Sequence, residues 1–311
     1  MGRRCIFTAK VCWNKMIGQR FYRLRLEVCG EGAAAFANAM PGQFVEIDAS
    51  NLRLPALSNI PEQLQDTAQR HIILRRPFSF ADIEVPDDSH AVIEIVYCVL
   101  GPATMRMTTL ERDDQLSVIG PLGNGFKVSE NSKAAILVAG GMGAAPLQYL
   151  AKHIKGNYPT MEVIVMAGAR NRRELPFSLR TESIRAEAGE WLDEFARYGV
   201  ESIVATDDGS AGFAGFVTEA LERWLDNCPY RAEEMMIFAC GPEPMLAQSA
   251  RIASKSNIPC QVSMERMMGC GFGVCQSCVV ACRADGGDES CYKLCCEDGP
   301  VFDSREVIFR V

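Results

Sequence analysis

The chain has 311 residues, of which 48% are hydrophobic and 23% charged, and its formal net charge is −7 at pH 7. This composition is typical of a globular protein rather than a disordered or fibrous one, and the length predicts two or three domains. The acidic balance argues against nucleic acid or an anionic membrane surface as the main partner. No apolar run approaches the roughly 18–20 residues that span a bilayer, and residues 1–18 lack the pattern of a signal peptide. We therefore expect a cytoplasmic protein without a membrane segment.

The first 126 residues have the pattern of a β protein. Strands are predicted where polar and apolar residues alternate or β-branched residues gather, over residues 5–13, 20–29, 43–48, 71–74 and 92–99. Short strands with no helices between them indicate a barrel or a sandwich. Residues 50–70 do not fit this pattern and are predicted to be an inserted loop that contains a short helix.

From about residue 133, strands alternate with helices. The predicted strands cover residues 134–139, 163–167, 202–205, 235–239 and 261–264, and the predicted helices cover 146–154, 183–198, 217–227 and 244–256. This alternation indicates a parallel sheet with helices on both faces. After about residue 265 the chain is rich in glycine and cysteine, with little periodicity. We therefore expect a multidomain β and α/β protein in three parts: 1–129, 130–264 and 265–311.

Eight of the 14 cysteines lie after residue 259. In a reducing compartment they should be thiols or metal ligands rather than disulfides. Cys270, Cys275 and Cys278 have the C-x4-C-x2-C spacing of plant-type [2Fe–2S] ferredoxins, whose fourth ligand lies farther along the chain. Gly271 and Gly273 suit a loop that curls around a cluster, because glycine adopts positive φ at no steric cost.

Zinc is the main alternative metal for these cysteines. Zinc sites usually combine two short C-x2–4-C pairs, and the tail shows no obvious second pair. From spacing alone the fourth ligand of a cluster is undecided, since Cys282, Cys291, Cys295 and Cys296 all lie downstream.

Two glycine-bearing turns follow predicted strands. They are formed by Gly140, Gly141, Met142 and Gly143 after the first strand of the sheet, and by Cys240, Gly241, Pro242 and Glu243 after the strand at 235–239. A glycine turn between a strand and a helix can present backbone N–H groups to a phosphate, although such a turn can also be purely structural. Because both turns fall at the carboxyl edge of one parallel sheet, we expect a dinucleotide site there.

A third motif, Arg76-Pro77-Phe78-Ser79, lies in the β region. An arginine can bind a diphosphate through two hydrogen bonds, and a serine hydroxyl can bond to a flavin ring. Taken alone, the motif is also compatible with a strand edge that meets solvent.

In this order, the motifs resemble those of the ferredoxin–NADP reductase superfamily. The segment 206–218, the cysteine loop and the sequence Cys296-Glu-Asp-Gly-Pro-Val-Phe narrow the resemblance to the electron-transfer subunits of dihydroorotate dehydrogenase B, which are iron–sulfur flavoproteins. The resemblance covers nearly the whole chain. It implies an antiparallel β-barrel that binds FAD, a Rossmann-like parallel-sheet domain that binds NAD, and a small C-terminal [2Fe–2S] domain.

The resemblance also implies site residues. FAD would be held by Arg76, Pro77, Phe78, Ser79, Val96, Tyr97, Cys98, Ala103 and Thr104. The two glycine-bearing turns would shape the NAD site, with Cys240 near the nicotinamide. The cluster would be held by Cys270, Cys275, Cys278 and Cys296, the last because it lies three residues before Gly-Pro-Val-Phe. The family commonly has a basic residue where this chain has Pro102, and often another at the position of Cys98.

By this resemblance, electrons would pass from the FMN of a separate dihydroorotate dehydrogenase subunit, through the [2Fe–2S] cluster and FAD, to NAD⁺ in pyrimidine biosynthesis. The implied assembly is a heterotetramer. No acid–base residue is needed for hydride transfer, so no catalytic side chain is assigned. Arg170, Arg172 and Arg173 would favour a 2′-phosphate or form a solvated turn, so NAD rather than NADP is implied by the family alone. The alternatives are an NAD(P)H:ferredoxin-type oxidoreductase subunit with another partner, and a non-catalytic zinc-binding or redox-sensing module.

Overall fold

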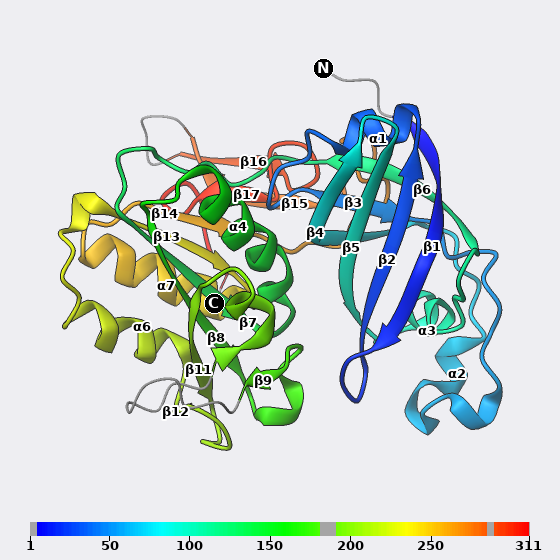
Figure 1. The fold of residues 1–311 in the computed structure, drawn as a ribbon, viewed down its shortest axis with the longest axis horizontal. Helices are drawn as coiled ribbons and strands as arrows, with labels where there is room; N and C mark the ends of the chain where they lie inside the picture. Colours follow the sequence, from blue (N-terminus) through cyan, green and yellow to red (C-terminus); the bar gives the residue numbers. More distant parts are fainter. Residues whose placement is uncertain (1–4, 181–190, 285–288, 311) are drawn as a thin grey trace.

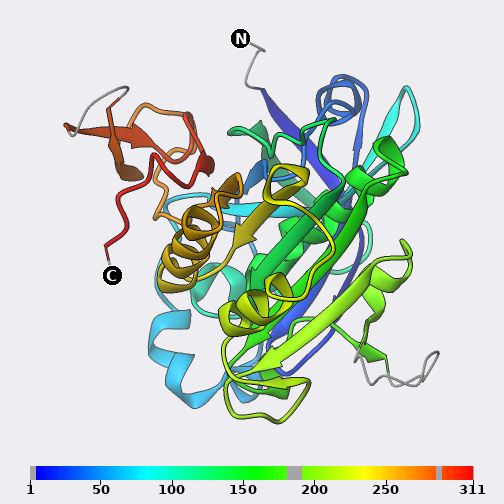
Figure 2. The same ribbon diagram turned by 90° about the vertical axis from the view of Figure 1, so that its left-hand side faces the viewer.

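The computed structural model describes residues 5–180, 191–284 and 289–310. A β-barrel and an open, mostly parallel sheet lie side by side, and the C-terminal segment is next to both (Figure 1). In the side view this segment, coloured orange to red, forms a small lobe at the edge of the molecule (Figure 2). The three-part, β and α/β architecture predicted from the sequence is confirmed.

The barrel is a closed antiparallel sheet of six strands in the order β1-β2-β5-β4-β3-β6. The strands are β1 (Ile6–Met16), β2 (Phe21–Cys29), β3 (Phe44–Ile47), β4 (Arg76–Asp87), β5 (His90–Cys98) and β6 (Gln115–Leu122). Alternate residues, such as Leu24 and Leu26 on β2 and Ile93 and Ile95 on β5, fill the interior. Helices α1 (Glu31–Phe36) and α3 (Pro102–Met107) lie at opposite ends of the barrel (Figure 1).

One predicted strand of the barrel is wrong. Residues 71–74 are not in a strand, and the side chain of Ile73 is 88% exposed. Strand β4 begins only at Arg76, which pairs with Ile47 at the end of β3. A β-branched run forms a strand only where a neighbouring strand offers its backbone, and β3 ends before it reaches these residues. Strands β4 and β6 were not predicted.

The insertion at residues 50–70 contains two 3-10 turns, η1 (Leu57–Asn59) and η2 (Glu62–Leu64), and the short helix α2 (Gln65–Ala68), as expected. It lies beside α3 at the lower end of the barrel (Figure 1). Ile60 and Ala68 are buried in the barrel core, so the insertion is packed against the barrel.

The second sheet has seven strands. In spatial order they are β12 (Phe213–Ala214), β11 (Glu201–Thr206), β8 (Glu162–Ala169), β7 (Ala134–Gly140), β13 (Met235–Cys240), β14 (Cys260–Ser263) and β17 (Val301–Asp303). All neighbouring pairs are parallel except β14 with β17. The five predicted strands of this region are confirmed to within two residues.

Helices cover both faces of this sheet. Helix α4 (Ala144–Asn157) lies on one face, between the sheet and β4, and helices α6 (Val217–Leu225) and α7 (Glu243–Lys255) lie on the other. These three helices were predicted. Half of the fourth predicted helix, 183–198, lies outside the described residues. Within the described part, Trp191–Leu192 is strand β10, paired with β9 (Leu179–Arg180), and only α5 (Asp193–Ala196) is helical.

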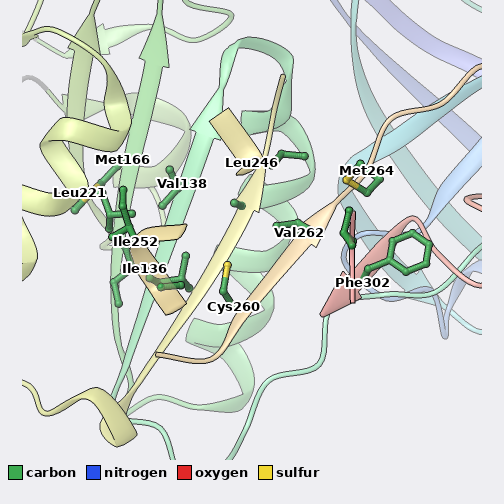
Figure 3. Close-up of a cluster of buried hydrophobic side chains, with 14 of the residues drawn as sticks. Ile136, Val138, Met166, Leu221, Leu246, Ile252, Cys260, Val262, Met264 and Phe302 are labelled. Atoms are coloured by element: carbon green, nitrogen blue, oxygen red, sulfur yellow. The ribbon is translucent and has the colours of Figure 1, made fainter. Parts of the chain in front are cut away.

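Apolar side chains on the face of α6 and α7 form a core that reaches the C-terminal segment. Ile136 and Val138 of β7 lie on the same side as Leu221 and Leu246, and Val262 and Phe302 extend the cluster to β17 (Figure 3). Burial of this apolar surface is the main stabilising contribution to such a sheet.

The C-terminal segment carries a hairpin of β15 (Val279–Arg283) and β16 (Ser290–Leu294) and then returns to the sheet through β17. Its buried cysteines, Cys278, Cys282, Cys295 and Cys296, belong to the same apolar cluster as Val262. The segment therefore shares its core with the sheet. No helix among the described residues is both long enough and apolar enough to cross a membrane.

Candidate functional site

The cysteine loop lies between β14 and β15, and its backbone N–H groups point at sulfur. The N–H groups of Phe272 and Cys275 lie 3.5 and 3.4 Å from Cys270 Sγ. Gly271 and Gly273 have φ angles of 78° and 83°, which confirms the need for glycine in the curl of the loop. Such N–H donors stabilise thiolate sulfur and are among the groups that tune iron–sulfur clusters.

Cys296 joins this loop. The N–H of Gly273 donates to Cys296 Sγ at 3.2 Å, and the N–H of Cys296 donates to Cys278 Sγ at 3.4 Å. The neighbouring Cys295 points elsewhere, since its thiol donates to the carbonyl of Met264 at 3.2 Å. The structure thus turns the sulfur of Cys296 toward the cysteine loop and the sulfur of Cys295 toward Met264, while the backbone N–H of Cys295 bonds to the Cys278 carbonyl.

The other two downstream cysteines lie beyond the loop. Cys282 and Cys291 face each other on β15 and β16, in the hairpin. Over residues 5–180, 191–284 and 289–310, no group of three or more His, Cys, Asp or Glu side chains is close enough to hold a single metal ion. A binuclear cluster divides four ligands between two irons. Four cysteines whose sulfurs receive or neighbour backbone N–H groups are a donor set that fits a [2Fe–2S] cluster.

The thiol acidities within this group differ. Hydrogen bonds from Ser277 and Cys270 lower the pKa of Cys275, which is exposed, to about 6. Burial, together with the neighbouring Cys278, raises the pKa of Cys296 to about 12. The Cys275 thiol is therefore largely deprotonated at neutral pH, and the thiolate is the form that binds metal.

A buried carboxyl group, Glu46 of β3, lies against the cysteine loop. Its side chain is 1% exposed, and neither carboxylate oxygen has a hydrogen-bond partner among the described residues. A Cβ atom on Gly271 would come within 2.7 Å of Glu46 Cγ and Oε1, so only glycine fits there. Burial raises the pKa of Glu46 to about 7, although Arg75 and Arg76 oppose this effect. Sequence analysis did not identify Glu46; its one signal is an acid between the strand residues Val45 and Ile47.

Register places the Arg76–Ser79 motif beside Glu46, because Pro77 pairs with Glu46 and Phe78 with Val45. The Arg76 guanidinium folds back on the chain and donates to the carbonyl of Leu74 at 2.7 Å. Arg76, Pro77, Phe78 and Ser79 are all partly exposed at the start of β4 and are thus accessible to a ligand.

The other predicted flavin residues follow on β5 and α3. Val96 is largely buried, and the side chain of Tyr97 is buried in the barrel, where its hydroxyl donates to Asn14 Oδ1 at 3.2 Å. Cys98 ends the strand. In α3, Ala103 is buried, and Thr104 Oγ1 accepts from the N–H of Leu100 at 3.0 Å. The side chains of Tyr97 and Ala103 are therefore closed to a ligand.

The two glycine-bearing turns touch each other. Their strands, β7 and β13, are neighbours, and Cys240 pairs with Ala139. A Cβ atom on Gly143 would lie 2.0 Å from the Cys240 carbonyl oxygen, and one on Gly140 would lie 2.7 Å from Pro242 Cδ. The glycines permit this approach, so residues 140–143 and 240–243 form one surface at the carboxyl edge of the sheet.

Within this surface, the Cys240 thiol is held neutral, because burial raises its pKa to about 12. Gly241 and Met142 complete the two turns. Glu243 forms an ion pair with Arg266, at 3.0 Å between Oε2 and Nη1. That ion pair connects the sheet edge to the chain that leads into the cysteine loop.

A cleft of about 1010 Å³ opens between the barrel and the turn that follows β8. Its walls come from the β1–β2 turn, the insertion, the end of β5, helix α3 and the turn at Arg170–Glu174. Arg170 is held by Glu174, at 2.8 Å between Nε and Oε2. Arg173 also lines this cleft, whereas Arg172 lines a smaller neighbouring cavity of about 280 Å³.

The chain matches two family models. Residues 265–308 match the iron–sulfur cluster binding domain of dihydroorotate dehydrogenase B, and residues 137–251 match the oxidoreductase NAD-binding domain. Among curated relatives, the chain is 32% identical over 301 residues to the electron transfer subunit of dihydroorotate dehydrogenase B (NAD(+)) from Caldanaerobacter subterraneus subsp. tengcongensis, covering 97% of this chain and 98% of that protein. It is 33% identical to the protein of the same name from Bacillus caldolyticus, covering 96% of each.

Solved structures support the same fold. An NADH-dependent reduced ferredoxin–NADP oxidoreductase, studied for flavin-based electron bifurcation, superposes with a TM-score of 0.70 at 25% identity, covering 99% of this chain and 92% of that one. A ferredoxin–NADP⁺ reductase from Neisseria gonorrhoeae, solved with bound FAD and NADP, superposes with a TM-score of 0.55 at 14% identity, covering 81% and 91%.

Proposed function

The chain belongs to the family of electron-transfer subunits of dihydroorotate dehydrogenase B, and from this premise we propose that it delivers electrons from dihydroorotate to NAD⁺ in pyrimidine biosynthesis. The donor is the FMN of a separate catalytic subunit, and this chain holds a [2Fe–2S] cluster, FAD and the NAD site. The observation that carries the proposal is the cysteine loop, in which Cys270, Cys275, Cys278 and Cys296 are joined by N–H contacts to sulfur.

When bound, the cluster carries single electrons and FAD converts them into the hydride that nicotinamide accepts. The chain's own residues bind and orient the cofactors and exclude water from them. Arg76, Pro77, Phe78 and Ser79 hold the flavin on the accessible start of β4, with backbone contacts from Val96, Tyr97 and Cys98 and from Ala103 and Thr104. The carboxyl edge of the sheet, residues 140–143 and 240–243, holds NAD with the neutral Cys240 thiol near the nicotinamide. No side chain is assigned a proton-transfer role.

We keep the division into a FAD-binding barrel (1–129), an NAD-binding domain (130–264) and a cluster domain (265–311) as part of the proposal. The family models, which match 137–251 and 265–308, support it. Strand β17, which belongs to the cluster domain in this division, completes the NAD-binding sheet. The cluster domain is thus fixed to its neighbour by backbone pairing.

The partner surface includes the rim of the cysteine loop. Met267 is 91% exposed and Val274 is 74% exposed, although both are apolar. Contiguous exposed apolar patches mark protein interaction sites, and both residues belong to the segment that carries the cysteine loop. We propose that the FMN-containing subunit docks over this rim and that two copies of each subunit form a heterotetramer.

The test begins with the anaerobically purified protein. We predict a visible spectrum with flavin and iron–sulfur bands, and iron, sulfide and FAD in the ratio of one [2Fe–2S] cluster to one FAD. A colourless protein that contains zinc would refute both cofactors and favour the zinc-binding alternative. Co-expression with the FMN-containing subunit should then yield a complex that reduces NAD⁺ when dihydroorotate is added. The Cys275→Ser variant removes one proposed cluster ligand. It should lose the dihydroorotate-dependent reduction of NAD⁺ while still binding FAD.

A second candidate is an NAD(P)H:ferredoxin-type oxidoreductase subunit with another electron partner. It is favoured by the superposition on the NADH-dependent reduced ferredoxin–NADP oxidoreductase over 99% of this chain. The same experiment separates the two. A chain that carries both cofactors but forms no complex with the FMN-containing subunit, and yet reduces ferredoxin with NADH or NADPH, would replace the pyrimidine assignment.

A further inference from the structure

The insertion at residues 50–70 forms one wall of the large cleft. Residues 53–56, 59, 61, 63 and 64 face the cleft from the insertion, and the turn at Arg170–Glu174 faces it from the NAD-binding domain. The barrel supplies the rest of the lining, including Tyr22 at the start of β2 and Met105 on α3. A cleft of about 1010 Å³ between two domains is of the size and place at which cofactors bind.

This wall is held in place by bonds at both of its ends. Thr109 Oγ1 donates to the carbonyl of Arg53 at 3.3 Å, and Arg106 Nη1 donates to the carbonyl of Arg70 at 3.1 Å. Ile60 and Ala68 anchor the middle of the insertion in the barrel core. The insertion is therefore a fixed part of the cleft wall.

The cleft is basic, although the chain as a whole is acidic. Four arginines and two glutamates line it. Arg170 and Glu174 neutralise each other, whereas Arg20 and Arg53 make no ion pair within the part of the chain that the structure describes. Two guanidinium groups without carboxylate partners in one cleft favour a polyanionic ligand, since each can bind a phosphate through two hydrogen bonds.

The position of the lining residues along the chain favours FAD over NAD as the dinucleotide bound in this cleft. Val99 and Leu100 follow directly after the proposed flavin residues of β5, and Met105 follows directly after Thr104. None of the proposed flavin residues is itself in the lining, but three lining residues are their near neighbours along the chain, so the cleft adjoins the FAD site rather than the glycine turns of the NAD site.

We propose that the insertion is a phosphate-binding wall of the FAD site, in which Arg53, together with Arg20 of the β1–β2 turn, binds the diphosphate of FAD. This inference rests on the proposed function only in that the chain binds FAD. It does not depend on which protein donates the electrons.

The test measures FAD release from the holoprotein, followed by the rise of flavin fluorescence on dilution. Arg53→Gln should weaken FAD binding about 10- to 100-fold, the range that follows from losing charge-assisted hydrogen bonds. Arg53→Lys, which keeps the charge but loses the planar fork, should fall in between. Raising the salt concentration should narrow the difference between Arg53→Gln and the unaltered protein. The matched control, Arg251→Gln, removes an exposed arginine from α7, away from the cleft, and should retain FAD normally.

NADH binding to the FAD-loaded variants separates the two dinucleotides. The proposal expects the dissociation constant of NADH to be unchanged in Arg53→Gln. If FAD binding is unchanged while NADH binding weakens, the cleft belongs to the nicotinamide dinucleotide and the proposal is overturned. Equal FAD retention in Arg53→Gln and Arg251→Gln also overturns it. Failure of dihydroorotate-dependent NAD⁺ reduction would refute the proposed function and leave the FAD measurements standing.

Discussion

Replacing Glu46 by glutamine should make the cluster-free protein more stable, and the gain should depend on pH. Burial raises the pKa of Glu46 from 4.5 to about 7 in the folded protein. Because the folded-state pKa lies above that of the unfolded chain, the folded state loses stability as pH rises through this interval. A rise of about 2.5 pH units corresponds to about 3 kcal/mol, since each unit is worth about 1.4 kcal/mol. Glutamine has nearly the same shape and no charge to desolvate.

The assay is denaturant unfolding, followed by far-UV circular dichroism, between pH 4.5 and pH 8. The stability difference between Glu46→Gln and the unaltered protein should be small at pH 4.5, grow up to about pH 7 and then level off near 3 kcal/mol. Glu222→Gln, at an exposed position on α6, is the control and should show no such growth. A difference that stays constant across the pH range would refute the reasoning, because it would mean that the Glu46 carboxyl does not titrate in this interval.

Three further predictions address the cluster, the NAD site and a buried ion pair of the barrel. Cys296→Ser should abolish or strongly reduce bound iron and sulfide, whereas Cys295→Ser should retain them; the reverse result would assign the fourth ligand to Cys295. Gly143→Ala should lower the melting temperature and NADH affinity, because its Cβ would lie 2.0 Å from a carbonyl oxygen of the neighbouring turn; unchanged NADH binding would show that the turn can open freely. Arg23→Met should destabilise the protein by about 3–5 kcal/mol in denaturant titrations, because it removes the close partner of the buried Glu94, which then keeps only Arg25 at 4.0 Å, and it also removes the ion-pair partner of Glu194. Adding Glu94→Gln should recover most of that loss, and no recovery would contradict the ion-pair explanation.

The sheet was predictable from the sequence because its strands are buried on both faces and read as continuous apolar runs. Residues 134–139 and 235–239 are of this kind, and each is followed by a glycine-bearing turn. The barrel was less predictable. Its strand β4 carries Pro77, Pro86 and several acids, and only pairing with β3 and β5 makes it a strand.

The candidate site was likewise predictable only in part. The cysteine loop could be identified because three of its cysteines lie within nine residues, and the positive φ values of Gly271 and Gly273 follow from that local curl. Glu46 could not be identified, since its burial results from a loop more than two hundred residues away. Nor does local sequence distinguish Cys295 from Cys296. Adjacent side chains point to different sides, and only the packed core shows that the first faces Met264 and the second faces Gly273.

The segment that carries the cysteine loop is held by contacts to both large domains. These contacts would fix the distance between a bound cluster and the flavin. From the sheet, β14 pairs with β17, and Glu243 holds Arg266. From the barrel side, the side-chain amide of Asn124 donates to the carbonyl of Asp298 at 2.8 Å, just beyond Cys296. A loop held by only one domain would move with every shift between the domains. Because this loop is held by both, it is fixed relative to the start of β4, where the flavin is proposed to bind.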